Sequence, residues 1–328
     1  MADVLRVPEM LEAMPASCAP PEVEAVLMSM GFPPIQRCTR HKVSFHATYF
    51  LEFAGPLPSA AEGRAVLQLI GSELGDKPLF HLDRPISAGS IARASELAQE
   101  AGIRVPQVLA HGEVEQWGPL CNVPFVVYEF VSTATVEDEV IAPEKDFLAV
   151  RADVQLKLTS RSLATVDTEP LPRFEDCFAF TSYLRGLAEQ IKAIELVDAL
   201  VKMDDCLRAA GLEPQPPTLI HQDLNDGNVL CSPDASGEWK LDALIDWEGA
   251  VVGDPRLCYE RAEPWLSLRR IALIVKIRWL MASFAGGLSS TRLPRCCAEE
   301  LVEKYEELGR KLQSGGWLVS VQPLPPWR

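Results

Sequence analysis

The segment that decides the fold runs from Thr218 to Pro255 and reads TLIHQDLNDGNVLCSPDASGEWKLDALIDWEGAVVGDP. It holds two apolar runs, Val229 to Cys231 and Trp239 to Ile245, separated by a stretch rich in Ser, Pro, Asp and Gly. Apolar runs that flank such a stretch are typical of two strands joined by a turn. We therefore predict a β-hairpin, which brings Asp246 back to the end of the hairpin that holds Asn228.

The polar residues around that end of the hairpin suit phosphoryl transfer. Mg²⁺ takes oxygen ligands, usually one or two carboxylates together with substrate phosphates, so Asn228 and Asp246 are candidate metal ligands. Asp223, in the preceding loop, is placed to accept a proton from an attacking hydroxyl group. A His-x-Asp followed by Asn and a later Asp is the recurring arrangement of protein kinases. With His221, the sequence contains all four residues.

In HQDLNDGNVL and LIDWEGAVVGDP the sequence resembles the aminoglycoside phosphotransferase and choline kinase-like family, particularly its fungal members, whose usual text is close to HGDLHPGNIL and IDWE. VPQVLAHG and PFVVYEF are similar to the strands that precede that family's interlobe hinge. SLATVDTEPL is similar to the helix end before its substrate-binding helices. The resemblance is close over residues 218–256 and loose over residues 35–260.

This resemblance implies an α+β, bilobal, protein-kinase-like fold. The expected parts are a small β-rich N-terminal lobe with an N-terminal extension in residues 1–131 and a larger α-helical lobe in residues 132–328. The helical lobe carries the catalytic loop and the substrate region, and ATP and Mg²⁺ are the implied cofactors. The implied site residues are Asp223 as the base, His221 as the brace of the catalytic loop, Asn228 and Asp246 as metal ligands, and Gln68, Glu129 and Val131 at the nucleotide.

The nucleotide half of the sequence departs from the family pattern at three places. The phosphate-covering loop is expected at Arg37 to Phe45, yet RCTRHKVSF contains no glycine. Gln68 takes the strand position of the family's phosphate-pairing Lys or Arg, and Ile91 takes the position of its glutamate partner. Removing one preorganised charge of this kind costs about 3–4 kcal/mol of transition-state stabilisation, or roughly 10²–10³ in rate.

These departures leave three hypotheses open. The first is an ATP- and Mg²⁺-dependent phosphotransferase that acts on a hydroxyl group of a small molecule. The second is a kinase-like fold repurposed for non-phosphoryl acid/base chemistry, a cyclisation or condensation in secondary metabolism, and it is motivated by Gln68 and Ile91. The third is a non-catalytic, kinase-like binding protein. The hypotheses differ in whether Asp223 and ATP are needed.

Elsewhere the patterns predict strands and helices. Strands are predicted in residues 44–53 and 64–70 and in VPQVLAHGEV and CNVPFVVYEFV, with a helix from its N-cap Ser90 to its stop at Gly102. Beyond Val131 the apolar period changes to 3.6 residues, which is typical of helices. One continuous helical pattern runs from Leu184 to Gly211, and two further helices are predicted in residues 265–284 and 298–312.

Composition and charge exclude some classes of function. The 328 residues include 31 Lys and Arg against 46 Asp and Glu, a formal net charge of -15. Nucleic-acid binders need a basic footprint, so a small-molecule substrate is favoured over a nucleic-acid partner. The sequence has nine cysteines without a Cys-x-x-Cys pair, no secretory signal and no apolar stretch long enough to span a membrane. We therefore predict a cytoplasmic protein without a membrane partner, whose oligomeric state is left open.

A few other residues have plain structural interpretations. Trp247, Trp265 and Trp279 are expected in the core. Asp254, in Gly-Asp-Pro, is expected in a loop or at a helix N-cap. Glu248, two residues after Asp246, is interpreted either as an acid that supports the metal ligands or as a neighbour of the metal.

Overall fold

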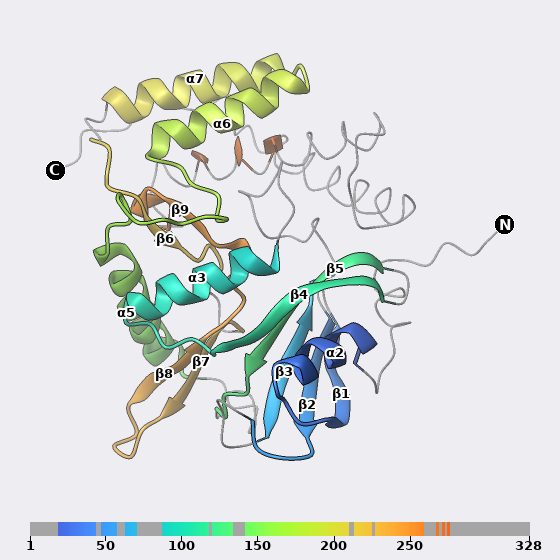
Figure 1. Cartoon of the computed structure of the whole chain (residues 1–328). Coiled ribbons are helices and arrows are strands. Elements are labelled where there is room, and N and C mark those ends of the chain that lie inside the picture. The colour runs from blue at the N-terminus through green and yellow to red at the C-terminus, as the bar shows by residue number, and fades with distance from the viewer. Residues whose placement is uncertain are drawn as a thin grey trace.

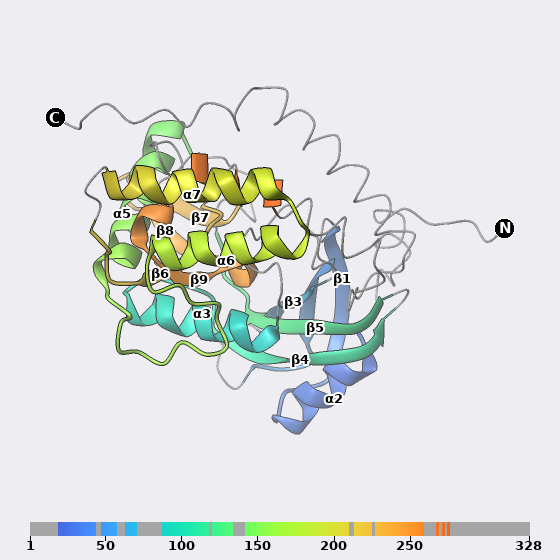
Figure 2. The ribbon, with the colours of Figure 1, turned by 90° about the horizontal axis from the view of Figure 1, so that it is seen from above.

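The structure is a computed structural model of the chain, shown in Figure 1. It describes residues 19–43, 47–57, 63–70, 87–117, 120–133, 142–209, 213–224 and 227–258, and the helical residues 267–268, 271–272 and 274–275. A five-stranded sheet forms one side of the molecule, and the paired helices α6 (Cys177–Gln190) and α7 (Ile194–Ala209) lie on the opposite side (Figures 1 and 2). Helix α3 (Ala88–Glu100) lies between the sheet and this helix pair.

The sheet is antiparallel throughout, in the order β1-β2-β3-β5-β4. Its two faces differ in burial: in β3, Ala65, Leu67 and Leu69 are buried in a core shared with helix α2, and Gln68 on the opposite face is only half-buried. The strands are β1 (Ile35–Val43), β2 (Ala47–Phe53), β3 (Arg64–Leu69), β4 (Val108–Trp117) and β5 (Leu120–Glu129), and α2 spans Pro21–Ser29.

Strand β1 corrects the predicted phosphate-covering loop. The stretch from Arg37 to Val43 is paired with β2 along its length, so it is strand and not loop. Ser44 and Phe45 lie outside the described residues. The strand predicted over residues 44–53 is confirmed from Ala47 onward, and the other three predicted strands are confirmed as β3, β4 and β5.

Helix α3 (Ala88–Glu100) begins one turn earlier than predicted. Its N-cap is Ser87, whose side chain accepts a hydrogen bond from the backbone N–H of Ser90. Ser90 instead lies in the first turn, where its hydroxyl donates to the carbonyl of Ser87. The predicted stop is confirmed, because Gly102 follows the C-cap with a φ of 77°.

The helical part of the chain contains α5 (Glu144–Ser160), α6 (Cys177–Gln190) and α7 (Ile194–Ala209). The single helix predicted over residues 184–211 is wrong, because the chain breaks at Lys192, whose φ is 56°. The break folds α7 back beside α6 (Figures 1 and 2) and buries Leu184 and Leu200 in one cluster. It leaves Ile194 at 72% exposure, although the helical pattern had placed it on the apolar face.

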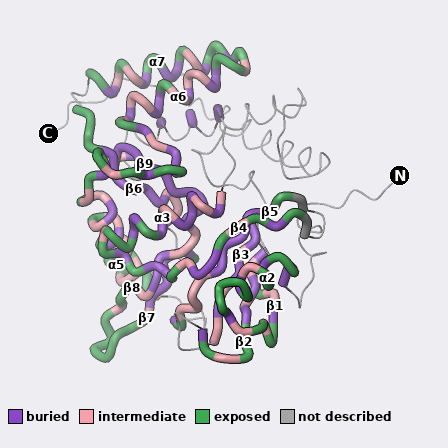
Figure 3. The backbone as a smooth tube through the Cα atoms, in the orientation of Figure 1, coloured by how far each residue is buried: buried purple, intermediate pink, exposed green. Residues whose placement is uncertain are grey.

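The predicted hairpin is confirmed as β7 (Val229–Pro233) and β8 (Trp239–Leu244), which are antiparallel. Beside it, β6 (Thr218–Ile220) pairs with β9 (Val251–Gly253), and the short 3₁₀ turns η1 (Trp247–Gly249) and η2 (Pro255–Cys258) flank β9. Figure 3 shows β6 and β9 buried, whereas the outer end of the β7–β8 hairpin is exposed. Of the helix predicted over residues 265–284, only six residues from 267 to 275 are described, and they are helical. The helix predicted over 298–312, Trp265 and Trp279 lie outside the described residues.

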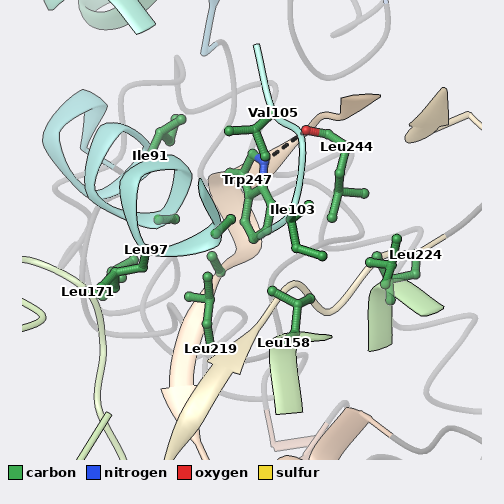
Figure 4. Close-up of a cluster of buried hydrophobic side chains, with 14 of the residues drawn as sticks. Ile91, Leu97, Ile103, Val105, Leu158, Leu171, Leu219, Leu224, Leu244 and Trp247 are labelled. Atoms are coloured by element: carbon green, nitrogen blue, oxygen red, sulfur yellow. Dashed lines mark hydrogen bonds between the residues drawn. The ribbon is translucent and has the colours of Figure 1, made fainter. Parts of the chain in front are cut away.

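A third apolar cluster joins the sheet side to the hairpin side. Ile91 and Leu97 of α3 pack in it with Leu219 of β6 and with Trp247, which is 1% exposed (Figure 4). The indole Nε1 of Trp247 donates to the carbonyl of Leu244 at 3.1 Å. The prediction that Trp247 is a core residue is therefore confirmed. Among the described residues, no helix combines the length and the apolar character that crossing a membrane requires.

Candidate active site

His221 ties the loop after β6 to the end of the hairpin. The side chain is 1% exposed, and its Nε2 lies 2.8 Å from the carbonyl oxygen of Ile245. Its Nδ1 accepts from the backbone N–H of Asp223 at 3.3 Å, and its ring packs edge-on against Trp247. The tautomer protonated at Nε2 satisfies both bonds. These are the contacts that the predicted bracing role requires.

Asn228 connects the predicted base to the hairpin. Its Nδ2 donates to Asp223 Oδ2 at 3.0 Å and to the Asp223 carbonyl at 2.9 Å. Its own carbonyl accepts from the backbone N–H of Ile245 at 3.0 Å, directly before Asp246. The structure therefore brings Asp223, Asn228 and Asp246 together. Because the Asn228 nitrogen is turned to Asp223, the amide oxygen is the atom with the chemistry to bind a cation.

Two non-glycine residues at this site have left-handed backbone conformations. Asp246 has a φ of 73° and Gln222 a φ of 70°. Such conformations cost about 1–3 kcal/mol each, and they persist where surrounding contacts hold them. The Gln222 side chain donates to the carbonyl of Gly249. The backbone strain therefore lies beside the predicted base and at the second predicted metal ligand.

Gln68 reaches Asp246 from the sheet. Its Nε2 donates to Asp246 Oδ1 at 3.5 Å, and its Oε1 accepts from the hydroxyl of Tyr128 at 3.4 Å. Gln68, predicted at the nucleotide, thus lies next to the predicted metal ligand Asp246. Tyr128 was missed by the sequence reasoning. PFVVYEF marks Tyr128 as a strand residue, but its place on the same face as Gln68 follows only from the pairing of β3 with β5.

The pKa of Tyr128 is raised well above its ordinary value, first by burial and then by the negative charges of Glu248 and Asp246. Tyr128 is therefore a hydrogen-bond donor across the physiological pH range. The two carboxyl groups also create a negative field at this point. Glu248 is only 2% exposed, and its charge acts on Tyr128, so it is a buried neighbour of the site and not a surface residue.

The expected cation and glutamate pair is not formed by Gln68 and Ile91. Ile91 is 1% exposed and packs in the apolar cluster with Val126. Arg64, at the start of β3, lies over the ring of Phe130, 4.0 Å from its centroid. The contact on Phe130 places this guanidinium just beyond the end of β5, away from Gln68 in the strand.

Glu129 and Val131, predicted at the nucleotide, lie at the end of β5 and just after it. The Glu129 carboxylate accepts from the backbone N–H of Gln107 at 3.2 Å, and the Glu129 N–H donates to the Gln107 carbonyl at 2.8 Å. Val131 is half-buried. The same strand carries Tyr128, so Glu129 directly follows the residue that contacts Gln68.

The residues present fit a divalent cation. Asn228 and Asp246 supply hard oxygen donors, and the carboxyl group of Glu248 lies close enough to act on the same Tyr128 as that of Asp246. Within the described parts of the chain, no group of three or more His, Cys, Asp and Glu side chains is arranged to hold a metal. The remaining ligands would therefore be water and phosphate oxygens, as is usual for Mg²⁺.

Asp254 has the structural place that the sequence suggested. It is fully buried and directly precedes η2, where its carbonyl accepts from the N–H of Leu257 at 2.9 Å. Its Oδ1 accepts from the Arg256 side-chain Nε at 2.8 Å and from the Arg256 backbone N–H at 3.0 Å. These contacts fix the chain where it leaves the segment that carries the site.

Comparisons with known proteins bear on the family and the fold. A family model described as the phosphotransferase enzyme family matches residues 60–257. A GDP complex of a point mutant of an aminoglycoside 2′-phosphotransferase, type IIIa, is 17% identical with a TM-score of 0.52, covering 90% of this chain and 98% of that one. The GDP and kanamycin complex of APH(2″)-IIIa is 16% identical with a TM-score of 0.53, covering 90% and 99%.

The apo form of a thermostable mutant of APH(4)-Ia is 15% identical with a TM-score of 0.50, and it covers 89% of this chain and 99% of that one. No curated protein gives a significant match to the sequence. The likeness to the solved structures confirms the predicted α+β, protein-kinase-like fold.

Proposed function

Because this chain belongs to the phosphotransferase enzyme family, we propose that it transfers the terminal phosphoryl group of ATP to a hydroxyl group of a small molecule. The observation that carries the proposal is the double hydrogen bond of Asn228 to Asp223. It joins the base and the first metal ligand in one rigid unit, and the Asn228 carbonyl bonds the residue before Asp246. Turn-forming residues alone would not require an amide that bonds both the side chain and the backbone of Asp223.

In the proposed reaction, Asp223 orients the acceptor hydroxyl and takes its proton as the new oxygen–phosphorus bond forms. The bond between the terminal phosphorus and the bridging oxygen breaks, and ADP leaves with that oxygen. His221 holds the loop of Asp223 against the hairpin through its contact with the Ile245 carbonyl. Phosphoryl transfer depends mainly on positioning and charge stabilisation, so this bracing is a direct contribution to the rate.

Asn228 and Asp246 would hold Mg²⁺, which when bound neutralises charge on the phosphates. Gln68 lies next to this position, and Glu129 and Val131 would flank the nucleotide where β5 ends. Two of the similar structures are GDP complexes, and one of these also contains kanamycin. These contents support a purine nucleotide and a small hydroxyl-bearing acceptor as the two substrates.

We place the enzyme in the cytoplasm, acting in secondary metabolism. The cysteines that the structure describes with their side chains, Cys38, Cys177, Cys206 and Cys231, are free thiols, which supports a reducing compartment. The proposed division at residues 131 and 132 puts the sheet and α3 in the N-terminal lobe. The cluster of Ile91 and Trp247 would then form part of the contact between the lobes.

The test is a thermal-unfolding titration with ATP, with and without Mg²⁺, followed by an assay of ADP release. A ligand at a hundredfold excess over its dissociation constant stabilises the native state by about 2.7 kcal/mol, which is easily measured. We expect stabilisation by ATP that increases with Mg²⁺, and ADP release with at least one acceptor from a broad hydroxyl and amine panel. A folded protein that neither binds ATP nor consumes it would refute the proposal.

A second candidate function is acid/base chemistry without phosphoryl transfer, such as a cyclisation or condensation. It is favoured by one observation: Gln68 and Ile91 provide no cation and glutamate pair, and Gln68 instead bonds Asp246 and Tyr128. This function predicts that Asp223→Ala abolishes product formation and that omission of ATP does not. A binding protein without catalysis predicts full function in Asp223→Ala and in Asp246→Ala.

A further inference from the structure

The Gln68 side chain forms a chain of hydrogen bonds from the sheet to Asp246. Its Nε2 donates to Asp246 Oδ1 at 3.5 Å, and the Tyr128 hydroxyl donates to Gln68 Oε1 at 3.4 Å. A primary amide has a donor end and an acceptor end. Only this orientation of the amide gives the carboxylate a donor and the hydroxyl an acceptor at once. The orientation of Gln68 is therefore set from both sides.

The two residues that form this chain lie on rigid strands. Gln68 is directly opposite Val126 in the β3–β5 register, and Tyr128 is two residues further along β5, on the same face. Diagonal neighbours of this kind are within reach of a long aromatic side chain. Both strands are internal to the sheet, since β3 lies between β2 and β5, and β5 lies between β3 and β4. Neither strand has a free edge along which it can shift.

The Asp246 end needs such a support. Its backbone is left-handed, with a φ of 73° and a ψ of 56°, directly before the turn η1. The bond from the Ile245 N–H to the Asn228 carbonyl fixes the backbone on the hairpin side. The contact from Gln68 is made to the carboxylate itself, and it comes from residues 178 positions away in the sequence. The sheet thus contributes one contact that orients the carboxylate.

We propose that Tyr128 is a positioning residue that acts through Gln68 to orient the Asp246 carboxylate for the divalent cation. This inference rests on the proposed function and extends it. The Tyr128 and Gln68 pair orients by neutral hydrogen bonds and brings no positive charge to the phosphates. Tyr128 touches no reacting atom in this role, so its removal should be felt only through Gln68.

The test uses Mn²⁺ as the probe and measures its binding to the full chain by electron paramagnetic resonance, with and without ADP. The variants are Tyr128→Phe, Gln68→Met and the double variant. Tyr128→Phe deletes one oxygen and keeps the ring. The matched control is Tyr49→Phe, which removes a hydroxyl from the buried, opposite face of the same sheet. Thermal unfolding of each variant establishes that it is folded.

We expect each single variant to weaken Mn²⁺ binding about fivefold to tenfold, the usual effect of one lost hydrogen bond. The double variant should be no weaker than the worse single variant, because the hydroxyl acts only through the amide. Tyr49→Phe should bind Mn²⁺ as the wild type does. In the ADP-release assay, the Tyr128 and Gln68 variants should lower kcat and leave the KM of the acceptor unchanged.

Two results would refute the positioning role of Tyr128 and leave the proposed function intact. One is unchanged Mn²⁺ binding in folded Tyr128→Phe, and the other is a double variant whose loss is the product of the two single losses, which would mean independent effects. Failure of the wild-type protein to bind either Mn²⁺ or ATP is a distinguishable result. It would refute the proposed function, and the positioning role of Tyr128 and Gln68 would be refuted with it.

Discussion

The β7–β8 hairpin keeps its polar residues within one short stretch of chain, whereas the sheet supplies its contribution from strands far apart in the sequence. Asp223, Asn228 and Asp246 come from 24 consecutive positions of the chain and are joined by contacts between neighbouring elements. Gln68 and Tyr128 are separated from each other by 60 positions and meet only because β3 and β5 pair. Residues that are close in the sequence, as in the hairpin segment, can keep their arrangement as one unit. Residues from separate strands, as in the sheet, can be substituted one at a time.

The sheet side shows this kind of change. Ile91 of α3 is buried in an apolar cluster with Trp247, and Gln68 is bonded to Asp246 and Tyr128. We propose that the hairpin side holds the base and the metal ligands, and that the neighbouring strand position, Gln68, serves this site with a neutral side chain.

The largest expected effect is on the hairpin side. Asp223→Asn keeps the size of the side chain and removes the base, so we expect the rate of ADP release to fall by about 10²–10⁴. ATP binding, measured by thermal unfolding, should remain. The control is Asp153→Asn, an exposed residue of α5 whose carboxylate pairs only with Lys157 in the described contacts. If Asp223→Asn retained the wild-type rate with ATP, the hairpin would not hold the base.

The next effect is on the sheet side. Ile91→Glu places a charge at a position that is 1% exposed, and an uncompensated buried charge costs about 3–5 kcal/mol. We expect a clear loss of unfolding free energy in urea denaturation, and only a small loss for the control Ile91→Leu, which conserves volume. An unchanged stability of Ile91→Glu would mean that a charged partner is within reach, and that the glutamate position of α3 has not become part of the core.

The same contrast explains what could be predicted from the sequence. The hairpin was predicted because strand, turn and strand follow one another within residues 229–244, so short-range patterns suffice. Strand β1 was missed because the resemblance assigned residues 37–45 to the phosphate-covering loop, and its Arg37, Arg40 and Lys42 gave no apolar run against that assignment. It is an edge strand, and edge strands commonly carry such charges.

Two other errors have a similar origin. The break at Lys192 has no glycine or proline, and the apolar period continues across it, so no local signal marks the end of α6. Tyr128 could be assigned to a strand, but its partner Gln68 depends on the pairing of β3 with β5. Pairing between distant strands is set by packing of the whole sheet and not by the local sequence.

The smallest effect concerns the end of the hairpin segment, where Asp254 lies near Cys177. Burial, and then the charge of Asp254, raises the pKa of the Cys177 thiol from 9.0 to about 12. The unfolded chain loses this proton near pH 9 and the folded chain does not, so stability is retained below pH 9 and decreases as the pH rises toward 12. The slope for one group is at most about 1.4 kcal/mol per pH unit.

Urea denaturation between pH 8 and pH 11 would measure this slope, and Cys177→Ala should reduce it. Cys206→Ala, at a partly exposed thiol of α7, is the matched control for the removal of a thiol. Because the Cys177 thiol is also buried, it should react with a thiol reagent only after unfolding. Equal slopes in wild type and Cys177→Ala would show that the folded chain does not shield the Cys177 thiol beside Asp254.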